Sequence, residues 1–421
     1  MNYRNLFDGV NNSVRLENGR VFVPINFDNG ATTPPLWSAV NIVNNNIQNY
    51  ASIGRGSGPK EELCTTMFQE ARNDILEFFN LNNSDTHNVV FVKSTTEGLN
   101  LLAKVLLKDK KEVVLTTRME HHANDLPWRY TARLDYVEVD DLGRIRLEDI
   151  ERKLKWYRGQ VRYVTITAAS NVTGYINDIN KIAKLCHRYG AKIVVDGAQI
   201  VAHREVNMLG ESEDEQIDFF VFSAHKAYAP FGSGAIVGRK EYLCEVEPFL
   251  KGGGIVEWVS DDSLEWNRLP ERLEAGTQNF LGVIAMSRAL KDLKLIGFEN
   301  IARHENQIKE YLIREMKKME HVILYGDNDN FDDRLGIVCF NIINKNFETV
   351  AEEFAKKRAI SLRCGKFCAH PYVDRLLGEK KHSSDKKTEV EVGMIRASLG
   401  LYNTMEEAKV FLHHVASFAN S

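Results

Sequence analysis

The stretch Asp218-Phe-Phe-Val-Phe-Ser-Ala-His-Lys226 decides the fold. Its apolar residues, Phe219 to Phe222, predict a strand that is buried on both faces of a sheet. Lys226 follows where this strand ends, at the edge where open α/β sheets bind their ligands. A desolvated lysine holds its proton less firmly, and the free amine can form a Schiff base with an aldehyde cofactor. Most lysines after a strand are ordinary surface residues, so the rest of the chain must decide between the two interpretations.

The same pattern, a buried strand that ends in polar residues, recurs earlier in the chain. Strands are predicted at 88–92, 113–117, 161–167 and 191–196, and helices lie between them. The polar residues that follow these strands are, in order, Thr95 and Thr96, His121, Asn171, and Asp196 with Gln199. This alternation predicts an α/β protein with a doubly wound, mainly parallel sheet and a ligand along its carboxyl edge.

Each strand-end residue has a chemical interpretation and an ordinary one. The Ser/Thr run at 94–96 opens a helix and predicts an anion site, or else a capping box completed by Glu97. His121 offers a flat ring for stacking and proton transfer, although adjacent histidines also bind metals or lie on the surface. Asn171 can donate to a ring hydroxyl. Asp196 follows a buried apolar run, where a carboxylate needs a partner that compensates its charge. The protonated nitrogen of a pyridinium ring can be that partner.

Composition narrows the class of protein. The chain has 421 residues, 43% of them hydrophobic, and a net charge of −4, which gives no reason to expect nucleic acid or an anionic membrane as partner. No apolar run reaches transmembrane length, and the first residues do not form the apolar segment of a signal peptide. Six scattered cysteines do not make a disulfide framework. We therefore expect a reduced, cytoplasmic protein.

The length predicts two domains. We place a large ligand-binding domain at residues 25–281, and a smaller α+β domain formed by residues 282–421 together with an N-terminal arm, residues 1–24. The Gly-rich stretch 50–58, with its single arginine at position 55, is predicted to be a flexible loop, which either approaches a ligand or partner closely or is a plain linker. The highly charged stretch 379–390 is predicted to be a mobile surface loop.

Together these motifs resemble the class V aminotransferase family of enzymes dependent on pyridoxal 5′-phosphate. Within it, the chain is most similar to the cysteine desulfurase and selenocysteine lyase group of the SufS type. The resemblance extends from Asp28-Asn-Gly-Ala-Thr to Arg396-Ala-Ser-Leu. The motifs that carry it are Thr95-Thr-Glu-Gly-Leu-Asn100, Met119-Glu-His-His-Ala-Asn124, Ser170-Asn-Val-Thr-Gly174, Val195-Asp-Gly-Ala-Gln199, Ser223-Ala-His-Lys226 and Glu274-Ala-Gly-Thr277. It implies fold type I, the aspartate aminotransferase-like fold.

The resemblance also implies a role for each matching residue. Lys226 is the expected Schiff-base lysine, His121 stacks on the cofactor ring, Asp196 pairs with its nitrogen and Gln199 with its hydroxyl. Thr96, Ser223 and His225 hold the phosphate, with Thr95 as a further backbone donor and Thr277 contributed by the second subunit of a homodimer. Asn171 and Arg396 match residues that bind the substrate α-carboxylate, and Arg363 matches an arginine close to it.

The segment Arg363-Cys-Gly-Lys-Phe-Cys368-Ala-His-Pro matches the loop that carries the active-site cysteine of desulfurases. It departs from the family frame at Cys364, and at Lys366-Phe367, which replaces a His-His pair. A reactive cysteine must be a thiolate near neutral pH, and Arg363, Lys366 and His370 are expected to surround Cys368. A zinc site made by Cys364, Cys368 and His370 is the competing interpretation, but one short segment does not make a closed site.

We therefore expect an enzyme that converts L-cysteine to L-alanine, with a persulfide on Cys368 that passes to an acceptor, which can be another protein. Lys226 and His121 are the other expected catalytic residues, and no metal is expected. The alternatives are a selenocysteine lyase or other C–S β-lyase, an epimerase or an aminotransferase for another amino acid, in which Cys368 is unreactive. A non-catalytic binding protein with the same fold is a further alternative, against which the set Lys226, Asp196 and His121 argues.

Overall fold

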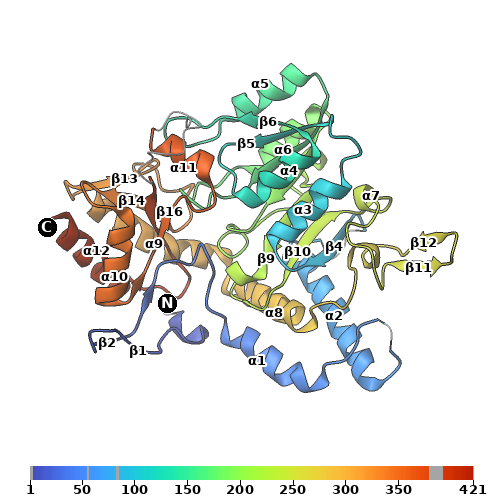
Figure 1. Cartoon of the computed structure of the whole chain (residues 1–421), viewed down its shortest axis with the longest axis horizontal. Coiled ribbons are helices and arrows are strands. Elements are labelled where there is room, and N and C mark those ends of the chain that lie inside the picture. The colour runs from blue at the N-terminus through green and yellow to red at the C-terminus, as the bar shows by residue number, and fades with distance from the viewer. Residues whose placement is uncertain (1–2, 55, 82–84, 379–391, 421) are drawn as a thin grey trace.

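The computed structural model describes residues 3–54, 56–81, 85–378 and 392–420. Two groups of strands and helices, each with its own buried core, make up the molecule (Figure 1). The arginine at position 55, in the predicted Gly-rich loop, and the whole of the charged stretch 379–390, predicted to be a surface loop, lie outside the described residues. Within the described residues no helix is both long enough and apolar enough to cross a membrane.

The large sheet has seven strands within the described residues and is mainly parallel, as predicted. Strands β5 to β9 run parallel to one another, and β10 runs antiparallel to both of its neighbours. The order across the sheet is β4 (His87–Val92), β10 (Gly234–Arg239), β9 (Phe219–Ser223), β8 (Lys192–Asp196), β7 (Val161–Thr167), β5 (Val113–Thr117) and β6 (Arg133–Val137).

Strand β9 lies in the interior of this sheet, as its sequence predicts. Phe219 and Val221 pack on one face, in a core that also contains α3, whereas Phe220 and Phe222 pack on the other face. Helix α3 approaches β9 so closely that a Cβ on Gly98 would lie 2.5 Å from Val221 Cγ1. The first face also holds α4 and α7, and the second holds α2, α5, α6 and α8. The helix bounds are α1 (Trp37–Asn46), α2 (Pro59–Phe78), α3 (Thr95–Val105), α4 (Leu126–Thr131), α5 (Leu147–Tyr157), α6 (Ile179–Arg188), α7 (Lys240–Leu243) and α8 (Phe280–Ile296).

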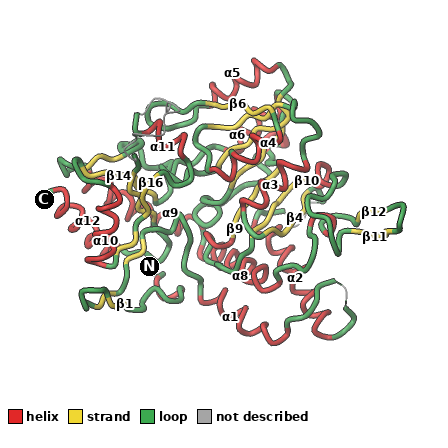
Figure 2. Tube along the Cα trace, viewed as in Figure 1, coloured by secondary structure: helices red, strands yellow, loops and turns green. Residues whose placement is uncertain are grey.

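The smaller group is built on an antiparallel sheet whose order is β13 (Val322–Leu324), β14 (Ile337–Ile342), β17 (Met394–Ser398) and β16 (Arg363–Gly365). Figure 2 shows these strands gathered with the C-terminal helices, apart from the large sheet. The accompanying helices are α9 (Phe298–Met316), α10 (Phe347–Arg358), α11 (His370–Leu376) and α12 (Met405–Ala419).

Two features of the packing bear on the predicted domain boundaries. The buried residues of α8 belong to the core of the large sheet, although the prediction assigns residues 282–296 to the small domain. Ile25 and Phe27 belong to the small core, because β3 (Ile25–Asn26) pairs with β15 (Ile360–Ser361). The division at residue 281 stays a proposal, and the packing favours a boundary after α8.

Three strands of the large domain were not predicted from the sequence. They are β10 and the two strands of a hairpin, β11 (Val256–Val259) and β12 (Leu264–Trp266), which projects from the large domain (Figure 1). Short strands beside glycines give a weak apolar signal. The remaining two-stranded sheet pairs β1 (Val14–Arg15) with β2 (Val21–Phe22) in the N-terminal arm.

Candidate functional site

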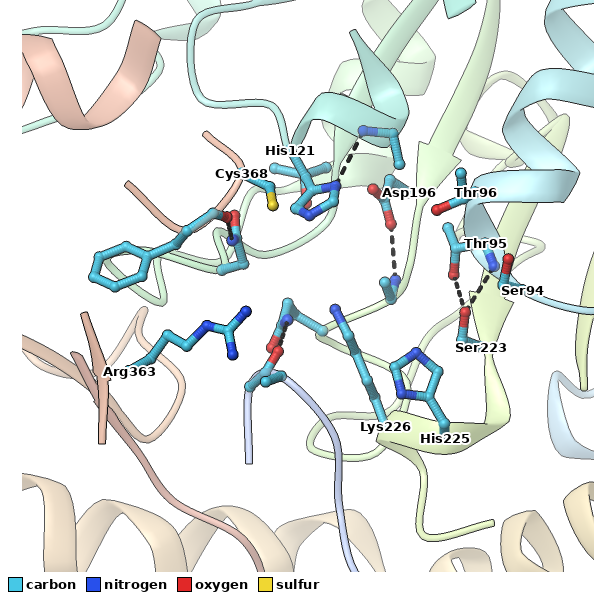
Figure 3. Close-up of a pocket in the computed structure, with 18 of the residues that line it drawn as sticks. Ser94, Thr95, Thr96, His121, Asp196, Ser223, His225, Lys226, Arg363 and Cys368 are labelled. Carbon is cyan, nitrogen blue, oxygen red and sulfur yellow. Dashed lines mark hydrogen bonds between the residues drawn. The ribbon is translucent and has the colours of Figure 1, made fainter. Parts of the chain in front are cut away.

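One pocket collects the polar residues from the strand ends together with residues of the small domain (Figure 3). Its lining includes Thr95, Thr96, His121, Asn171, Asp196, Gln199, Ser223, His225, Lys226, Arg363, Cys368 and Arg396. The fold therefore brings together all of the predicted site residues except Thr277. Segments about 300 residues apart in the sequence, such as those of Thr95 and Arg396, meet there because the small domain packs against the carboxyl edge of the large sheet.

Lys226 ends a short turn, Ala224–Lys226, that follows β9 and aims its side chain into the pocket (Figure 3). Burial of the side chain lowers its pKa to about 8, although Asp196 opposes the shift by favouring the ammonium form. At neutral pH a larger share of Lys226 is therefore the free amine than is usual for lysine. This is the electrostatic state that a lysine at the end of a buried strand was predicted to have.

Asp196 ends β8 and is 4% exposed. Among the described residues, the one hydrogen-bond donor to its carboxylate group is the backbone N–H of Ala198, 2.9 Å from Oδ1. Burial raises the pKa of this carboxyl group, and Lys226 opposes that shift. A buried carboxylate with so few donors has the capacity to accept a proton-bearing ring nitrogen.

His121 lies on the loop after β5, and its ring faces the pocket between Cys368 and Asp196 (Figure 3). Its Nδ1 accepts a hydrogen bond of 3.0 Å from the backbone N–H of Ala123. Burial, followed by the positive charge of Lys226, lowers the pKa of His121 to about 3. The ring is therefore neutral at physiological pH, with its proton on Nε2. Such a ring suits stacking on a flat ligand.

The first turn of α3 forms the polar end of the pocket. Ser94 caps the helix by accepting from the N–H of Glu97, as the capping interpretation predicts, and it also lines the pocket. The anion site stays a prediction, with which this arrangement is compatible. Ser223 Oγ accepts from the backbone N–H of Thr95 at 2.6 Å. Burial, with Lys226 next, lowers the pKa of His225 to about 4. Hydroxyls and N–H groups at a helix N-terminus fit a phosphate.

Arg396, on β17, and Arg363, on β16, enter the pocket from the small domain. The guanidinium of Arg396 is buried; Nη1 donates to the carbonyl oxygen of Asn171 at 2.8 Å, and Nη2 donates to Asp28 at 3.0 Å. Its Nε has no hydrogen-bond partner within the described residues. A Cβ on Gly30 would lie 3.2 Å from Arg396 Cζ, so glycine permits this close approach.

The loop that carries Cys368 is tied to the large domain through its backbone. The Nδ2 group of Asn171 donates to the carbonyl oxygen of Phe367 at 2.8 Å, and the N–H of His122 donates to that of Cys368 at 2.7 Å. Phe367 and Cys368 both have left-handed backbones, with φ of 51° and 55°. Such a conformation costs a residue with a Cβ roughly 1–2 kcal/mol, so these bonds hold the loop in a demanding shape.

The surroundings of Cys368 differ in part from those expected. Lys366 Nζ forms an ion pair with Asp374 Oδ1 at 2.7 Å, and the ring of His370 packs on that of His122, with centroids 4.7 Å apart. Cys364 packs against the small-domain core, and burial raises the pKa of its thiol. The described residues contain no group of three side chains able to hold a metal ion, which argues against the zinc interpretation.

Thr277 does not line this pocket. It is exposed, and it borders a different hollow together with Lys93 and Glu97. The motif that contains it is anchored by Glu274, which accepts hydrogen bonds from both Nη groups of Arg72 at 2.9 Å and from the N–H of Phe91 at 2.7 Å.

Several pocket residues were not predicted as site residues: Gly30, Ala31, Ser94, Ala123, Thr167, Ala198 and Phe367. Most contribute backbone or a small side chain, which leaves no chemical signal in a sequence. Gly30 could have been found from the sequence, because it lies in the motif Asp28-Asn-Gly-Ala-Thr. Its carbonyl oxygen accepts a hydrogen bond of 2.9 Å from Nε2 of Gln199, which was predicted as a site residue.

The donor and acceptor set fits pyridoxal 5′-phosphate. The pocket offers an amine of lowered pKa, a buried carboxylate for a ring nitrogen, a neutral ring for stacking, and a helix N-terminus with hydroxyls for a phosphate. These groups lie at different sides of one pocket, as a flat phosphorylated ligand requires.

Comparison with known proteins agrees with this arrangement. Residues 25–411 match the model of the family described as aminotransferase class-V. A probable cysteine desulfurase of Halalkalibacterium halodurans is 31% identical over 390 residues, which cover 90% of this chain and 89% of the relative. A probable cysteine desulfurase of Pyrococcus abyssi is 32% identical, with 92% of each chain covered. The solved apo structure of the cysteine desulfurase from Thermococcus onnurineus NA1 superposes with a TM-score of 0.84 at 30% identity, covering 94% of this chain and 95% of that one.

Proposed function

The chain belongs to the class V aminotransferase family, and we propose that it is a cysteine desulfurase that converts L-cysteine to L-alanine with pyridoxal 5′-phosphate as cofactor. The observation that carries the proposal is that Lys226 and Asp196, from the large domain, line the same pocket as Cys368, from the small domain. The relatives that are cysteine desulfurases support the same reaction. The cofactor, when bound, withdraws electrons from the α-carbon of an amino acid and so weakens its C–H bond.

Residues of the large domain are suited to hold this cofactor. Lys226 would attach its aldehyde carbon, Asp196 would accept the N–H of its ring, and His121 would cover one ring face. Gln199 would donate to the ring hydroxyl. Thr96, Ser223 and His225, with the backbone of Thr95, would bind the phosphate.

Lys226 and Cys368 would then divide the chemistry. The amine of Lys226, with a pKa of about 8, would accept the α-proton of the substrate. Asn171 and Arg396, with Arg363 nearby, hold the α-carboxylate. The thiolate of Cys368 attacks the substrate sulfur, so an S–S bond forms and the substrate C–S bond breaks. The β-carbon keeps the electron pair of the broken bond and takes up a proton. Lys226 would return the α-proton to the α-carbon, which gives alanine and leaves a persulfide on Cys368.

The persulfide must leave Cys368 before the next cycle, so an acceptor thiol, which can belong to another protein, completes the reaction. Cys368 is exposed, and none of the six cysteines is paired in a disulfide, which suits a reducing compartment such as the cytoplasm. We also propose a homodimer, in which Thr277 reaches the phosphate site of the partner. The exposure of Thr277 outside its own pocket supports this arrangement.

The alternative is another C–S β-lyase, a selenocysteine lyase, an epimerase or an aminotransferase on the same scaffold. These reactions share the attachment lysine and the loss of the α-proton, and they differ in whether Cys368 reacts. The backbone ties of Phe367 and Cys368 to Asn171 and His122 favour the desulfurase, because they hold the thiol against the pocket.

The test is to load the purified protein with pyridoxal 5′-phosphate, add L-cysteine and measure alanine. We expect a visible absorption band from the bound cofactor and catalytic release of alanine. A band without alanine would contradict the desulfurase, and the same protein would then be assayed with L-selenocysteine and other amino acids. A protein that stays colourless with added cofactor would contradict every enzymatic alternative.

A further inference from the structure

We propose that Asp28 sets the charge that the carboxylate-binding side of the pocket accepts, and so selects amino acids that carry a single carboxylate. Asp28 is not among the residues expected at the site. The inference rests on the proposed function, because it concerns the side of the pocket where Arg363 and Arg396 would bind the substrate α-carboxylate.

Asp28 lies between the two arginines. Its Oδ1 accepts a hydrogen bond of 3.0 Å from Arg396 Nη2, and its Oδ2 is 3.8 Å from Arg363 Nη1. The backbone fixes its position, because the N–H of Asp28 donates to Asn26 Oδ1 at 3.0 Å and the residue forms a β-bridge with Ser398. One carboxylate is therefore held where it neutralises one of two neighbouring guanidinium groups.

The charge balance follows directly. Asp196 and Lys226, on the sheet side of the pocket, carry opposite charges when both are ionised. On the other side, two guanidinium groups and the carboxylate of Asp28 leave one positive charge, which one substrate carboxylate neutralises. His121 and His225 add no charge near pH 7, since burial and Lys226 lower their pKa values to about 3 and about 4. Asp28 does not itself line the pocket and acts through the two arginines that do. Because it already neutralises one of their charges, a ligand with two carboxylates would bring one negative charge more than this side of the pocket can balance.

Arg363 is the group that would respond to loss of this charge. Its side chain is 54% exposed, it points into the pocket, and its pairing with Asp28 is the looser of the two (Figure 3). Arg396 is 3% exposed and already donates to Asn171 and Asp28. Without the carboxylate of Asp28, Arg363 is free to bind a second carboxylate of the ligand.

The experiment compares two amino acids that differ by one carboxylate. Binding of L-alanine and of L-aspartate to the cofactor-loaded protein is measured by calorimetry for the wild type, Asp28→Asn and Asp28→Glu. We expect the wild type to prefer L-alanine. Asp28→Asn, which keeps the shape and removes the charge, shifts the ratio of the two dissociation constants at least about tenfold toward L-aspartate. Asp28→Glu keeps the charge, and with it the wild-type preference.

A control variant separates selectivity from the loss of an ion pair in general. Asp333→Asn removes a partner of Arg144 far from the pocket, and it should leave the ratio unchanged. A ratio that is unchanged in Asp28→Asn, or that changes equally in Asp28→Glu, would overturn the inference and make Asp28 a structural residue. Equal binding of both ligands to the wild type would overturn it as well. The wild type could release no alanine from L-cysteine while Asp28→Asn still shifts the ratio of the two dissociation constants as expected. That result would refute the proposed function and leave the inference on Asp28 standing.

Discussion

The pocket has two walls that are built in different ways. The wall from the large sheet places Asp196 and Lys226 directly after buried strands, in surroundings that shift both pKa values. The wall from the small domain presents Arg363 and Cys368 as exposed side chains, the latter on a left-handed backbone.

This difference has a consequence for function. The first wall is fixed by the sheet and suits chemistry that needs a constant cofactor geometry. The second wall depends on a few long-range contacts, such as that between Asn171 and Phe367, and its residues can change without disturbing the sheet. We therefore expect substitutions in the first wall to affect every reaction of the protein, and substitutions in the second wall to affect the choice of substrate and reaction.

The largest effect is expected for Lys226→Ala. It removes both the attachment point of the cofactor and the acceptor of the α-proton, so alanine release should fall by at least about 10⁴-fold. Borohydride reduction followed by peptide mapping should find no cofactor adduct. Lys309→Met is the matched control: burial, followed by Arg204, also lowers the pKa of Lys309 to about 8, but this lysine lies outside the pocket. An adduct that persists on another lysine of Lys226→Ala would contradict the assignment.

Cys368→Ala tests the second wall alone. Alanine release from L-cysteine should fall by at least about 10²-fold, because the nucleophile is lost. The absorption band of the bound cofactor should stay, because Cys368 contributes nothing to the first wall. Cys364→Ala, which alters a thiol packed against the small-domain core, should retain activity. Full activity of Cys368→Ala would show that the two walls do not divide the chemistry in this way.

Asp196→Asn should have a smaller effect, because the side chain keeps its shape and loses only its charge. The amide cannot hold a proton on the cofactor ring, so kcat should fall by about 10²-fold. Steady-state kinetics with saturating L-cysteine measure this effect. An unchanged kcat would mean that the buried carboxylate serves the fold and not the reaction.

The pH dependence of cofactor attachment gives the smallest effect. Only the free amine of Lys226 reacts, so the rate at which apoprotein develops the absorption band should rise about tenfold per pH unit below pH 8. Above that pH the rate should level off, because the pKa of Lys226 is lowered to about 8. Stopped-flow mixing with pyridoxal 5′-phosphate measures the profile. A rate that still rises up to pH 10 would indicate an ordinary lysine.

The sequence predicted the first wall well for a physical reason. A buried strand has a strong apolar signal, and the residue after it must lie at the edge of the sheet, so Asp196 and Lys226 could be placed from local pattern alone. Both the fold class and the convergence of these residues in one pocket agree with that prediction.

The second wall was only partly predictable. Its arginines and cysteine were found through resemblance to a family, whereas the partners that fix them come from distant segments. Asp28 pairs with Arg396, and Lys366, which was expected beside Cys368, pairs with Asp374. Such pairings depend on how the two domains pack, and no local pattern of hydrophobicity encodes them.

The central claim is that sulfur passes from L-cysteine to Cys368. The most direct test is to mix the cofactor-loaded protein with L-cysteine, trap its thiols and measure the mass of the peptide that contains Cys368, beside a Cys368→Ala sample. We predict a peptide heavier by one sulfur atom, formed together with alanine and missing from the variant. Alanine formed with no added sulfur on this peptide would contradict the account.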